Sequence, residues 1–331
     1  MKLYILTTEK LQERFLEMSN NQLRKIELLI ENHIHGAFGV DFNNCSVEEI
    51  LEVSKELLKR GIGGFFPTFV TDTVENIRKQ TEIIKKAKSM QTSDMAEILG
   101  IHLEGIFVNP LKKGIQDEKL FLIPNVENYK LIEDDFIKIV TLAPELDEGL
   151  IEYLKTRGVK VQAGHCVDGD LKFVDGVTHL FNAMSGINHR EKNTALSALI
   201  NDDIYTEVIM DLVHLSKDTL ELIIKSKPEG KILPISDCLP LAYGNKTEMD
   251  FCNKKVYYDG KKITSKDGTL AGSSLLVDDI LKNLYKNGIN GYKYVKNLYG
   301  YHNIDVKGYI YLDEDNEILK IEKDNKIFYE K

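Results

Sequence analysis

The hydrophobic positions of the chain follow two alternating periods. Short continuous apolar runs predict strands, and after most of them apolar residues return every three or four positions, which predicts a helix. One such helix is expected from Val47 to Leu58, with its end near Gly61. The strands are expected at 26–30, 64–70, 98–103, 137–142, 159–163, 177–181, 206–210 and 232–235, and further helices at 74–84, 150–154, 194–200, 220–224 and 274–285.

This alternation predicts an α/β fold. Strands that alternate with helices form a mainly parallel sheet with right-handed crossovers. Eight such units within about 250 residues are what a closed (β/α)8 TIM-like barrel requires. A doubly wound open sheet is the alternative, but no G-x-G-x-x-G motif follows the first predicted strand, which disfavours it.

Some segments fall outside the eight units. We expect residues 25–302 to form the barrel, and residues 1–24 and 303–331 to pair into a small β satellite domain, in which 309–312 and 317–321 form a hairpin. Two alternating runs flank Asp259-Gly260, a dipeptide typical of tight hairpin turns. They predict a hairpin insertion at about 243–269, after the eighth strand.

Composition excludes several classes of protein. The chain has 331 residues, of which 43% are hydrophobic and 29% charged, and this apolar content excludes a disordered chain. The net charge is −9 and no basic stripe is present, which disfavours a nucleic-acid partner. A single Arg or His can still hold a small anion in an acidic protein.

Cysteine use and hydropathy bear on location. The four cysteines lie far apart and form no CxxC pair, which disfavours a structural zinc site and suits a reducing compartment. No run approaches the roughly 18 apolar residues of a membrane span. We therefore expect a cytoplasmic protein without a membrane partner.

Polar side chains recur where the predicted strands end. They are His33, His35, Glu104, His165, His179, Asp211, His214 and Asp237. Each one alone has an ordinary explanation, such as a solvated strand end, a core histidine or a helix cap. In a barrel, however, the carboxyl ends of all strands surround one mouth, and imidazole and carboxylate are ligands of Zn²⁺ and Fe²⁺. Their recurrence on successive strands predicts a metal site.

The segments that carry these residues resemble the N-acetylglucosamine-6-phosphate deacetylase family of the amidohydrolase superfamily. The most specific are Thr178-His179-Leu180-Phe181-Asn182-Ala183-Met184 and His102-Leu103-Glu104-Gly105, whereas His33-Ile34-His35 is shared by many hydrolases. Residues 141–145, 163–165, 236–237 and 268–273 match in the same order, so the resemblance extends from about 33 to 274.

The resemblance implies an activity and a role for each residue. The activity is hydrolysis of the N-acetyl group of N-acetylglucosamine 6-phosphate, which gives glucosamine 6-phosphate and acetate. Glu104, His165 and His179 would hold the main divalent metal (Zn, Fe or Mn), and His33 and His35 a second one. Asp237 would be the general acid and base. The substrate would be held by Asn182, Ala183, Arg190, His214, Leu275 and Val277, with Arg190 reaching the neighbouring active site of a homodimer.

Several positions depart from the family pattern. Glu31, Ile106, Leu212 and Lys192-Asn193 replace the family's Asp, Pro, Gly and Pro-Gly, and Gln116 replaces a His that bonds the substrate carbonyl. Gln116 can still donate through its amide. Three alternatives stay open: a deacetylase of another N-acetylated sugar phosphate, a catalytically weak protein that binds a sugar phosphate, and an amidohydrolase that opens a cyclic amide. Retention of the five potential ligands and Asp237 disfavours the second.

Overall fold

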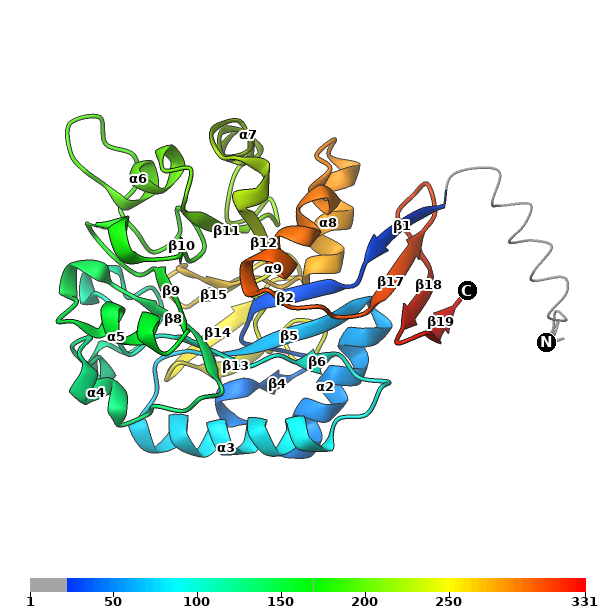
Figure 1. Cartoon of the computed structure of the whole chain (residues 1–331), viewed down its shortest axis with the longest axis horizontal. Coiled ribbons are helices and arrows are strands. Elements are labelled where there is room, and N and C mark those ends of the chain that lie inside the picture. Colours follow the sequence, from blue (N-terminus) through cyan, green and yellow to red (C-terminus); the bar gives the residue numbers. More distant parts are fainter. Residues whose placement is uncertain (1–22, 169) are drawn as a thin grey trace, which may run out of the picture.

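A parallel eight-stranded barrel forms the body of the molecule (Figure 1). The computed structural model describes residues 23–168 and 170–331. The strands pair in the order β2 (Leu29–Ile34), β5 (Ile62–Phe69), β7 (Ile101–Glu104), β8 (Ile137–Leu142), β9 (Lys160–Ala163), β10 (Gly176–Val177), β11 (Tyr205–Ile209) and β12 (Ile232–Ile235).

The barrel closes between its first and last strands. Just beyond β12, the Asp237 amide donates to the His33 carbonyl and the His35 amide donates to the Cys238 carbonyl, both at 2.9 Å. These bonds join β2 to the segment after β12 at the carboxyl ends of the strands. The predicted TIM-like barrel is therefore confirmed.

Helices cover the outside of the strands. They are α2 (Val47–Lys59), α3 (Val74–Met90), α4 (Val126–Lys130), α5 (Leu150–Thr156), α6 (Thr194–Ile200), α7 (Lys217–Ser226), α8 (Val277–Lys286) and α9 (Val295–His302). Local sequence fixes where α2 begins, because Ser46 accepts from the Glu49 amide while the Glu49 side chain accepts from the Ser46 amide. Its buried face carries Ile50 and Leu57, as the apolar spacing predicts.

One predicted strand is much shorter than expected. The apolar run 177–181 predicts a strand, but β10 ends at Val177. The chain then leaves the sheet, because His179 (φ 32°) and Phe181 (φ 76°) adopt the left-handed conformation that a strand does not allow. His179 therefore lies at the barrel mouth and not inside a strand.

A second predicted strand, 98–103, is divided in two. β6 (Glu97–Ile98) and β7 are separated at Gly100, which has φ +147°. A Cβ at this position would lie 2.3 Å from Lys138 Cγ, so only glycine lets the chain bend against β8 here.

The satellite sheet has four antiparallel strands. Its order is β1 (Arg24–Glu27), β17 (Gly308–Leu312), β18 (Ile318–Lys323) and β19 (Lys326–Glu330). The predicted strand 26–30 is thus divided between this sheet and β2, so residues 25–27, which we expected in the barrel, belong to the satellite. Residues 1–22 of the predicted satellite lie outside the described residues.

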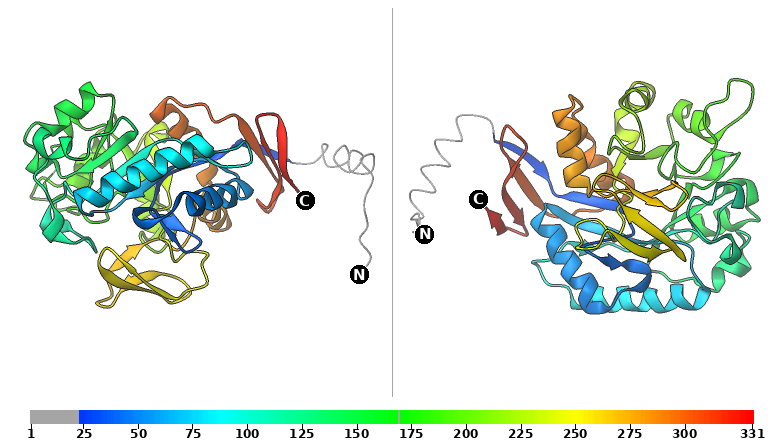
Figure 2. Two further views of the ribbon diagram at one scale, coloured as in Figure 1. Left: turned by 90° about the horizontal axis from the view of Figure 1, so that it is seen from below. Right: turned by 180° about the vertical axis from the view of Figure 1, so that it is seen from behind.

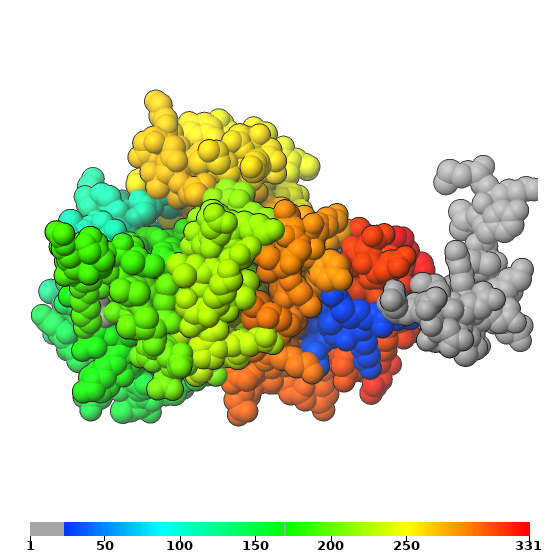
Figure 3. Space-filling model, turned by 90° about the horizontal axis from the view of Figure 1, so that it is seen from above, coloured from blue at the N-terminus to red at the C-terminus, as the bar shows by residue number. Residues whose placement is uncertain are grey.

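The insertion after β12 is larger than the predicted hairpin. It is a four-stranded antiparallel sheet of β13 (Glu248–Phe251), β14 (Lys254–Tyr258), β15 (Ile263–Ser265) and β16 (Leu270–Gly272). A separate short pair, β3 (Gly36–Ala37) and β4 (Val40–Asp41), follows β2. In the insertion, Phe251, Val256 and Ile263 pack into a small core. The insertion (yellow) and the satellite (red) lie on different sides of the barrel (Figure 2), and the insertion stands out as a separate layer (Figure 3).

A buried lysine fastens the end of α6. Lys227 Nζ donates to the carbonyls of Ala198 (3.0 Å), Asn201 (2.6 Å) and Ile204 (2.8 Å). The last carbonyls of a helix lack partners within it, and an ammonium satisfies them. Among the helices of the described ranges, none has the length and apolar content needed to cross a membrane.

Candidate active site

A cavity of about 300 Å³ opens at the carboxyl ends of the barrel strands. Its polar wall includes residues that the sequence singles out: His35, Glu104, Gln116, His165, His179, Asn182, His214 and Asp237. Its opposite wall comes from the insertion, through Phe251 and residues 269–272. A concave site with a few convergent polar groups is typical of small-molecule binding.

Three ligand-type side chains form a first group in this cavity. Glu104 Oε1 lies 3.0 Å from His165 Nε2 and 2.8 Å from His179 Nε2, and the two nitrogens are 3.2 Å apart. Ligands that hold zinc tetrahedrally at about 2.0–2.2 Å are separated by roughly 3.3 Å. The donors of this first group therefore fit a divalent metal ion.

A second group lies beside the first. Asp237 Oδ1 is 3.0 Å from His35 Nε2 and 3.4 Å from His33 Nε2, and these two nitrogens are 3.2 Å apart. The other oxygen of Glu104, Oε2, lies 3.2 Å from His35 Nε2. The Glu104 carboxylate thus contacts both groups, one through each oxygen.

Most of the histidines are held so that Nε2 faces the cavity. Nδ1 lies 2.8 Å from the Lys112 carbonyl in His165, 3.2 Å from the Thr68 carbonyl in His35, and 3.2 Å from Glu207 Oε2 in His33. A carbonyl or carboxylate only accepts, so Nδ1 carries the proton and Nε2 offers a lone pair to a metal. The fourth, His179, has a buried Nδ1 without a hydrogen-bond partner among the described residues.

The charges of the two groups favour a bound cation. Burial by itself lowers the pKa of His35, but hydrogen bonds with Asp237 and Glu104 raise that pKa to about 9. Burial likewise opposes ionisation of Glu104, yet the neighbouring His33 and His165 bring its pKa well below the ordinary range. Both shifts show that these buried side chains favour positive charge among them. A bound divalent metal ion would supply that charge, and the imidazole and carboxylate donors suit one or two such ions.

Several of these side chains point into the cavity from residues with left-handed backbone conformation. His165 (φ 47°), His179 (φ 32°) and Asp237 (φ 53°) all have positive φ. For residues other than glycine this costs on the order of 1 kcal/mol each and recurs at functional sites. The turn taken immediately after β9, β10 and β12 brings three side chains from different strands to one cavity.

Gln116 is buried and held by Thr71. Its Oε1 accepts from the Thr71 amide at 3.1 Å and also from the Thr71 hydroxyl. The Nε2 amide group therefore faces the cavity and lies 3.4 Å from His165 Nε2. Gly105 permits this contact, because a Cβ there would lie 2.4 Å from the Thr71 nitrogen and 2.6 Å from Gln116 Oε1.

The predicted substrate residues divide into two sets. Asn182, Ala183 and His214 line the cavity. Asp211 Oδ2 accepts from His214 Nδ1 at 2.7 Å and, although burial opposes it, raises the pKa of His214.

The structure does not bring Arg190, Leu275 and Val277 to the cavity wall. Arg190 is exposed in the loop between β10 and α6. Leu275 packs against the hydrophobic core, and Val277 is buried, with its amide donating to Glu31 Oε1 at 2.7 Å.

Two residues of the site, Thr71 and Glu207, are absent from the sequence predictions. Glu207 leaves a signal, since it is a charged residue inside the apolar run 206–210 and is fully buried. Thr71 leaves none, because a threonine at the end of a strand is common in any soluble protein.

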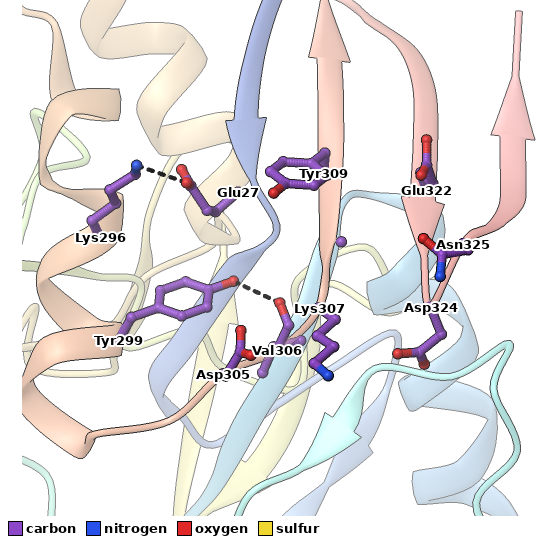
Figure 4. A pocket seen from close by; sticks show the side chains of 11 residues that line it. Glu27, Lys296, Tyr299, Asp305, Val306, Lys307, Tyr309, Glu322, Asp324 and Asn325 are labelled. Atoms are coloured by element: carbon purple, nitrogen blue, oxygen red, sulfur yellow. Dashed lines mark hydrogen bonds and ion pairs between the residues drawn. The ribbon is translucent and has the colours of Figure 1, made fainter.

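A larger hollow of about 790 Å³ lies elsewhere, between α9 and the satellite sheet (Figure 4). In it Lys296 Nζ pairs with Glu27 at 2.7 Å, and the Tyr299 hydroxyl donates to the Val306 carbonyl. Within the described residues, none of the potential metal-ligand groups lies there. The groups that could hold a metal, as far as residues 23–168 and 170–331 show, all lie on the barrel strands and at their carboxyl ends.

Known proteins similar to this chain carry one name almost throughout. The N-acetylglucosamine-6-phosphate deacetylase of Bacillus subtilis (strain 168) is 33% identical over 266 residues, covering 76% of this chain and 67% of the relative. The N-acetylgalactosamine-6-phosphate deacetylase of Escherichia coli O157:H7 is 28% identical over 277 residues, covering 79% and 73%. No protein-family model matches.

Solved structures agree with these relatives. The crystal structure of N-acetylglucosamine-6-phosphate deacetylase from Thermotoga maritima has a TM-score of 0.85 and 27% identity, covering 93% of this chain and 89% of that one. The Pasteurella multocida structure of the same name has a TM-score of 0.81 and 25% identity, covering 92% and 86%. From its sequence and its fold, this chain belongs to the N-acetylglucosamine-6-phosphate deacetylase family of the amidohydrolase superfamily.

Proposed function

We propose that this protein hydrolyses the N-acetyl group of N-acetylglucosamine 6-phosphate and releases acetate and glucosamine 6-phosphate. The observation that carries the proposal is the convergence of Glu104, His165 and His179 on one cavity that also holds Asp237. An amide is a poor electrophile with a poor leaving group, so its hydrolysis needs an activated water, a polarised carbonyl and a proton donor.

The proposed metal is a divalent zinc, iron or manganese ion. Glu104, His165 and His179 would hold it, and His33 and His35 with Asp237 would hold a second. When bound, such an ion lowers the pKa of water towards about 7 and polarises the acyl oxygen. The hydrogen bonds of Nδ1 in His165 and His35 support this role, because they leave Nε2 as the nitrogen that faces the cavity.

Asp237 would move the proton. Its carboxylate lines the cavity and contacts His35 Nε2 at 3.0 Å. Asp237 would accept a proton from the attacking water and deliver it to the departing amine. Gln116 Nε2, which Thr71 turns towards the cavity, would donate to the acyl oxygen as negative charge develops on it.

The sugar phosphate would be held by the remaining polar wall. Asn182 and Ala183 would contact it from the loop after His179, where both line the cavity. The raised pKa of His214 favours its cationic form, which would bind the phosphate. Arg190 would reach the neighbouring active site of a homodimer, which agrees with its exposed position on the loop. Leu275 and Val277 stay proposed contacts only because they follow the cavity-lining residues 269–272 in the chain.

A cytoplasmic location is part of the proposal. All four cysteines are free, which is expected in a reducing compartment.

A direct assay tests the proposed reaction. Metal-free protein would be loaded with Zn²⁺, Fe²⁺ or Mn²⁺ and incubated with the 6-phosphates of N-acetylglucosamine, N-acetylgalactosamine and N-acetylmannosamine, with acetate release measured. We expect the glucosamine epimer to react fastest. Preference for another epimer would leave a deacetylase of a different sugar phosphate, and no acetate from any of them with any metal would contradict the proposal.

A further inference from the structure

Glu207 is a charged residue in the interior of the barrel. It lies in the middle of β11 and is fully buried, at 0% exposure. A carboxylate without solvent is tolerated only where partners satisfy its oxygens. The arrangement of its partners therefore indicates what this residue does.

Both oxygens of Glu207 have donors. Oε1 accepts from Asn32 Nδ2 at 2.5 Å and from Gln162 Nε2 at 3.2 Å. Oε2 lies 3.2 Å from His33 Nδ1. Two side-chain amides thus hold one oxygen in place while the other faces a single imidazole nitrogen.

His33 is distinguished from the other candidate ligands by this partner. Lys112 and Thr68 orient His165 and His35 through neutral backbone carbonyls. A carboxylate on Nδ1 fixes the tautomer and increases the electron donation of the opposite nitrogen more than a neutral carbonyl does. The opposite nitrogen of His33, Nε2, faces the second group, where His35 and Asp237 lie.

We infer that Glu207 is a positioning residue for the second metal: it holds His33 with Nε2 towards His35 and Asp237, so that the second group binds a divalent cation in addition to the first. The inference rests on the part of the proposed function that gives the cavity a metal, and not on the substrate. What it adds to the proposed second ion is the role of Glu207.

Another set of ligand atoms has to be distinguished from this one. His33, His102 and Glu207 also lie close enough to form a group of three. However, His102 is engaged elsewhere, with Nε2 2.8 Å from the Thr141 hydroxyl and Nδ1 3.2 Å from the Asn32 carbonyl. We therefore expect Glu207 to act through His33 and not as a ligand itself.

Metal content tests the inference. Metal-free protein would be titrated with Zn²⁺ against a chelator of known affinity, and bound zinc counted per chain. We expect two zinc ions in the parent and one in Glu207→Gln, whose second ion binds about 10–100-fold more weakly. His102→Gln is the matched control, in the same buried layer, and should keep two.

Each outcome separates the hypotheses. A parent without zinc contradicts the proposed function, whereas a parent with only one contradicts this inference and the proposed second ion and leaves the first ion and the proposed reaction standing. Undiminished second binding in Glu207→Gln overturns it, and so does an equal loss in His102→Gln, which would make Glu207 a ligand. If Glu207→Gln does not fold, nitrogen-15 NMR of the zinc-loaded parent decides: His33 should bind through Nε2 and carry a proton on Nδ1, and the opposite pattern overturns the inference.

Discussion

The two ligand groups at the barrel mouth are built from different backbone. The two histidines of the second group come from one segment without positive φ: His33 lies in β2, His35 follows its last residue, and they face the cavity together because they are two residues apart. His165 and His179 of the first group lie just after their strands, in left-handed conformation. The second group thus takes its two histidines from one strand and only Asp237 from another, whereas each ligand of the first group comes from a different strand.

This difference has consequences for robustness. The second group needs only β2 and the segment after β12, which are hydrogen-bonded to each other, whereas the first requires β7, β9 and β10 to end at the same level. Strained residues persist only where the surrounding structure determines them. We therefore expect substitutions in the first group to be more damaging than those in the second.

The largest effect is expected for His179→Ala. This change removes a ligand of the first group, so the protein should lose its main metal and activity should fall by about 10³-fold or more, since metal polarisation is worth several kcal/mol. Metal analysis and acetate release would be measured together. His189→Ala, at an exposed position of the next loop, is the control and should match the parent. Unchanged metal content in His179→Ala would show that the first group is wrongly assigned.

Gln116→Ala tests whether the first group has an oxyanion donor next to it. Loss of such a donor typically lowers the rate by about 10²–10³-fold. The decrease should appear in kcat with little change in KM, because the bond matters most in the transition state. Gln116→His, which restores the residue type of the family, should keep or raise activity. Parent-like kinetics in Gln116→Ala would mean that another group donates.

Asp237→Asn tests the proton transfer at the second group. The variant keeps the shape of the side chain and removes the base, so the metal of the first group should still bind while kcat falls by about 10²-fold. Asp250→Asn changes an exposed aspartate of the insertion and serves as the control. Full activity in Asp237→Asn would assign the base to a different residue.

The smallest effect is expected from the Asp211–His214 pair, which belongs to neither group. Because Asp211 raises the pKa of His214 above its ordinary value of 6.5, the imidazole stays cationic to a higher pH, and substrate binding should weaken as the pH rises through that raised pKa. In Asp211→Asn the rise in KM should begin at lower pH and reach about tenfold near neutrality, the worth of one charged hydrogen bond. KM would be measured against pH, with Asp218→Asn, at an exposed position, as the control. Identical profiles for the parent and Asp211→Asn would contradict a role of His214 in phosphate binding.

The barrel was predictable because its signals are local. Apolar runs bounded by polar residues show where β5, β8 and β12 lie, and helical spacing shows α2 and α6. The end of β10 was not predictable in this way, since His179 stands in an apolar run and only the left-handed backbone takes it out of the strand. The split of 26–30 depends likewise on which sheet pairs with each half.

The site was predictable only as a set of candidate residues. Period two brings His33 and His35 to one face, but nothing local shows that Glu104 contacts both groups or that Thr71 holds Gln116. Such contacts join residues about 45 to 75 positions apart and depend on how strands are staggered around the barrel. The same reasoning explains why the proposed contacts of Leu275 and Val277 could not be judged from their segment.

The ammonium of Lys227 has a consequence for chemical labelling. Its three carbonyl partners and its burial keep the amine away from solvent, so an acylating reagent can reach it only when the end of α6 opens. Exposed lysines such as Lys225 react from the closed state. The rate at which Lys227 is modified, followed by mass spectrometry, therefore reports local opening at the carboxyl end of α6 without any engineered probe.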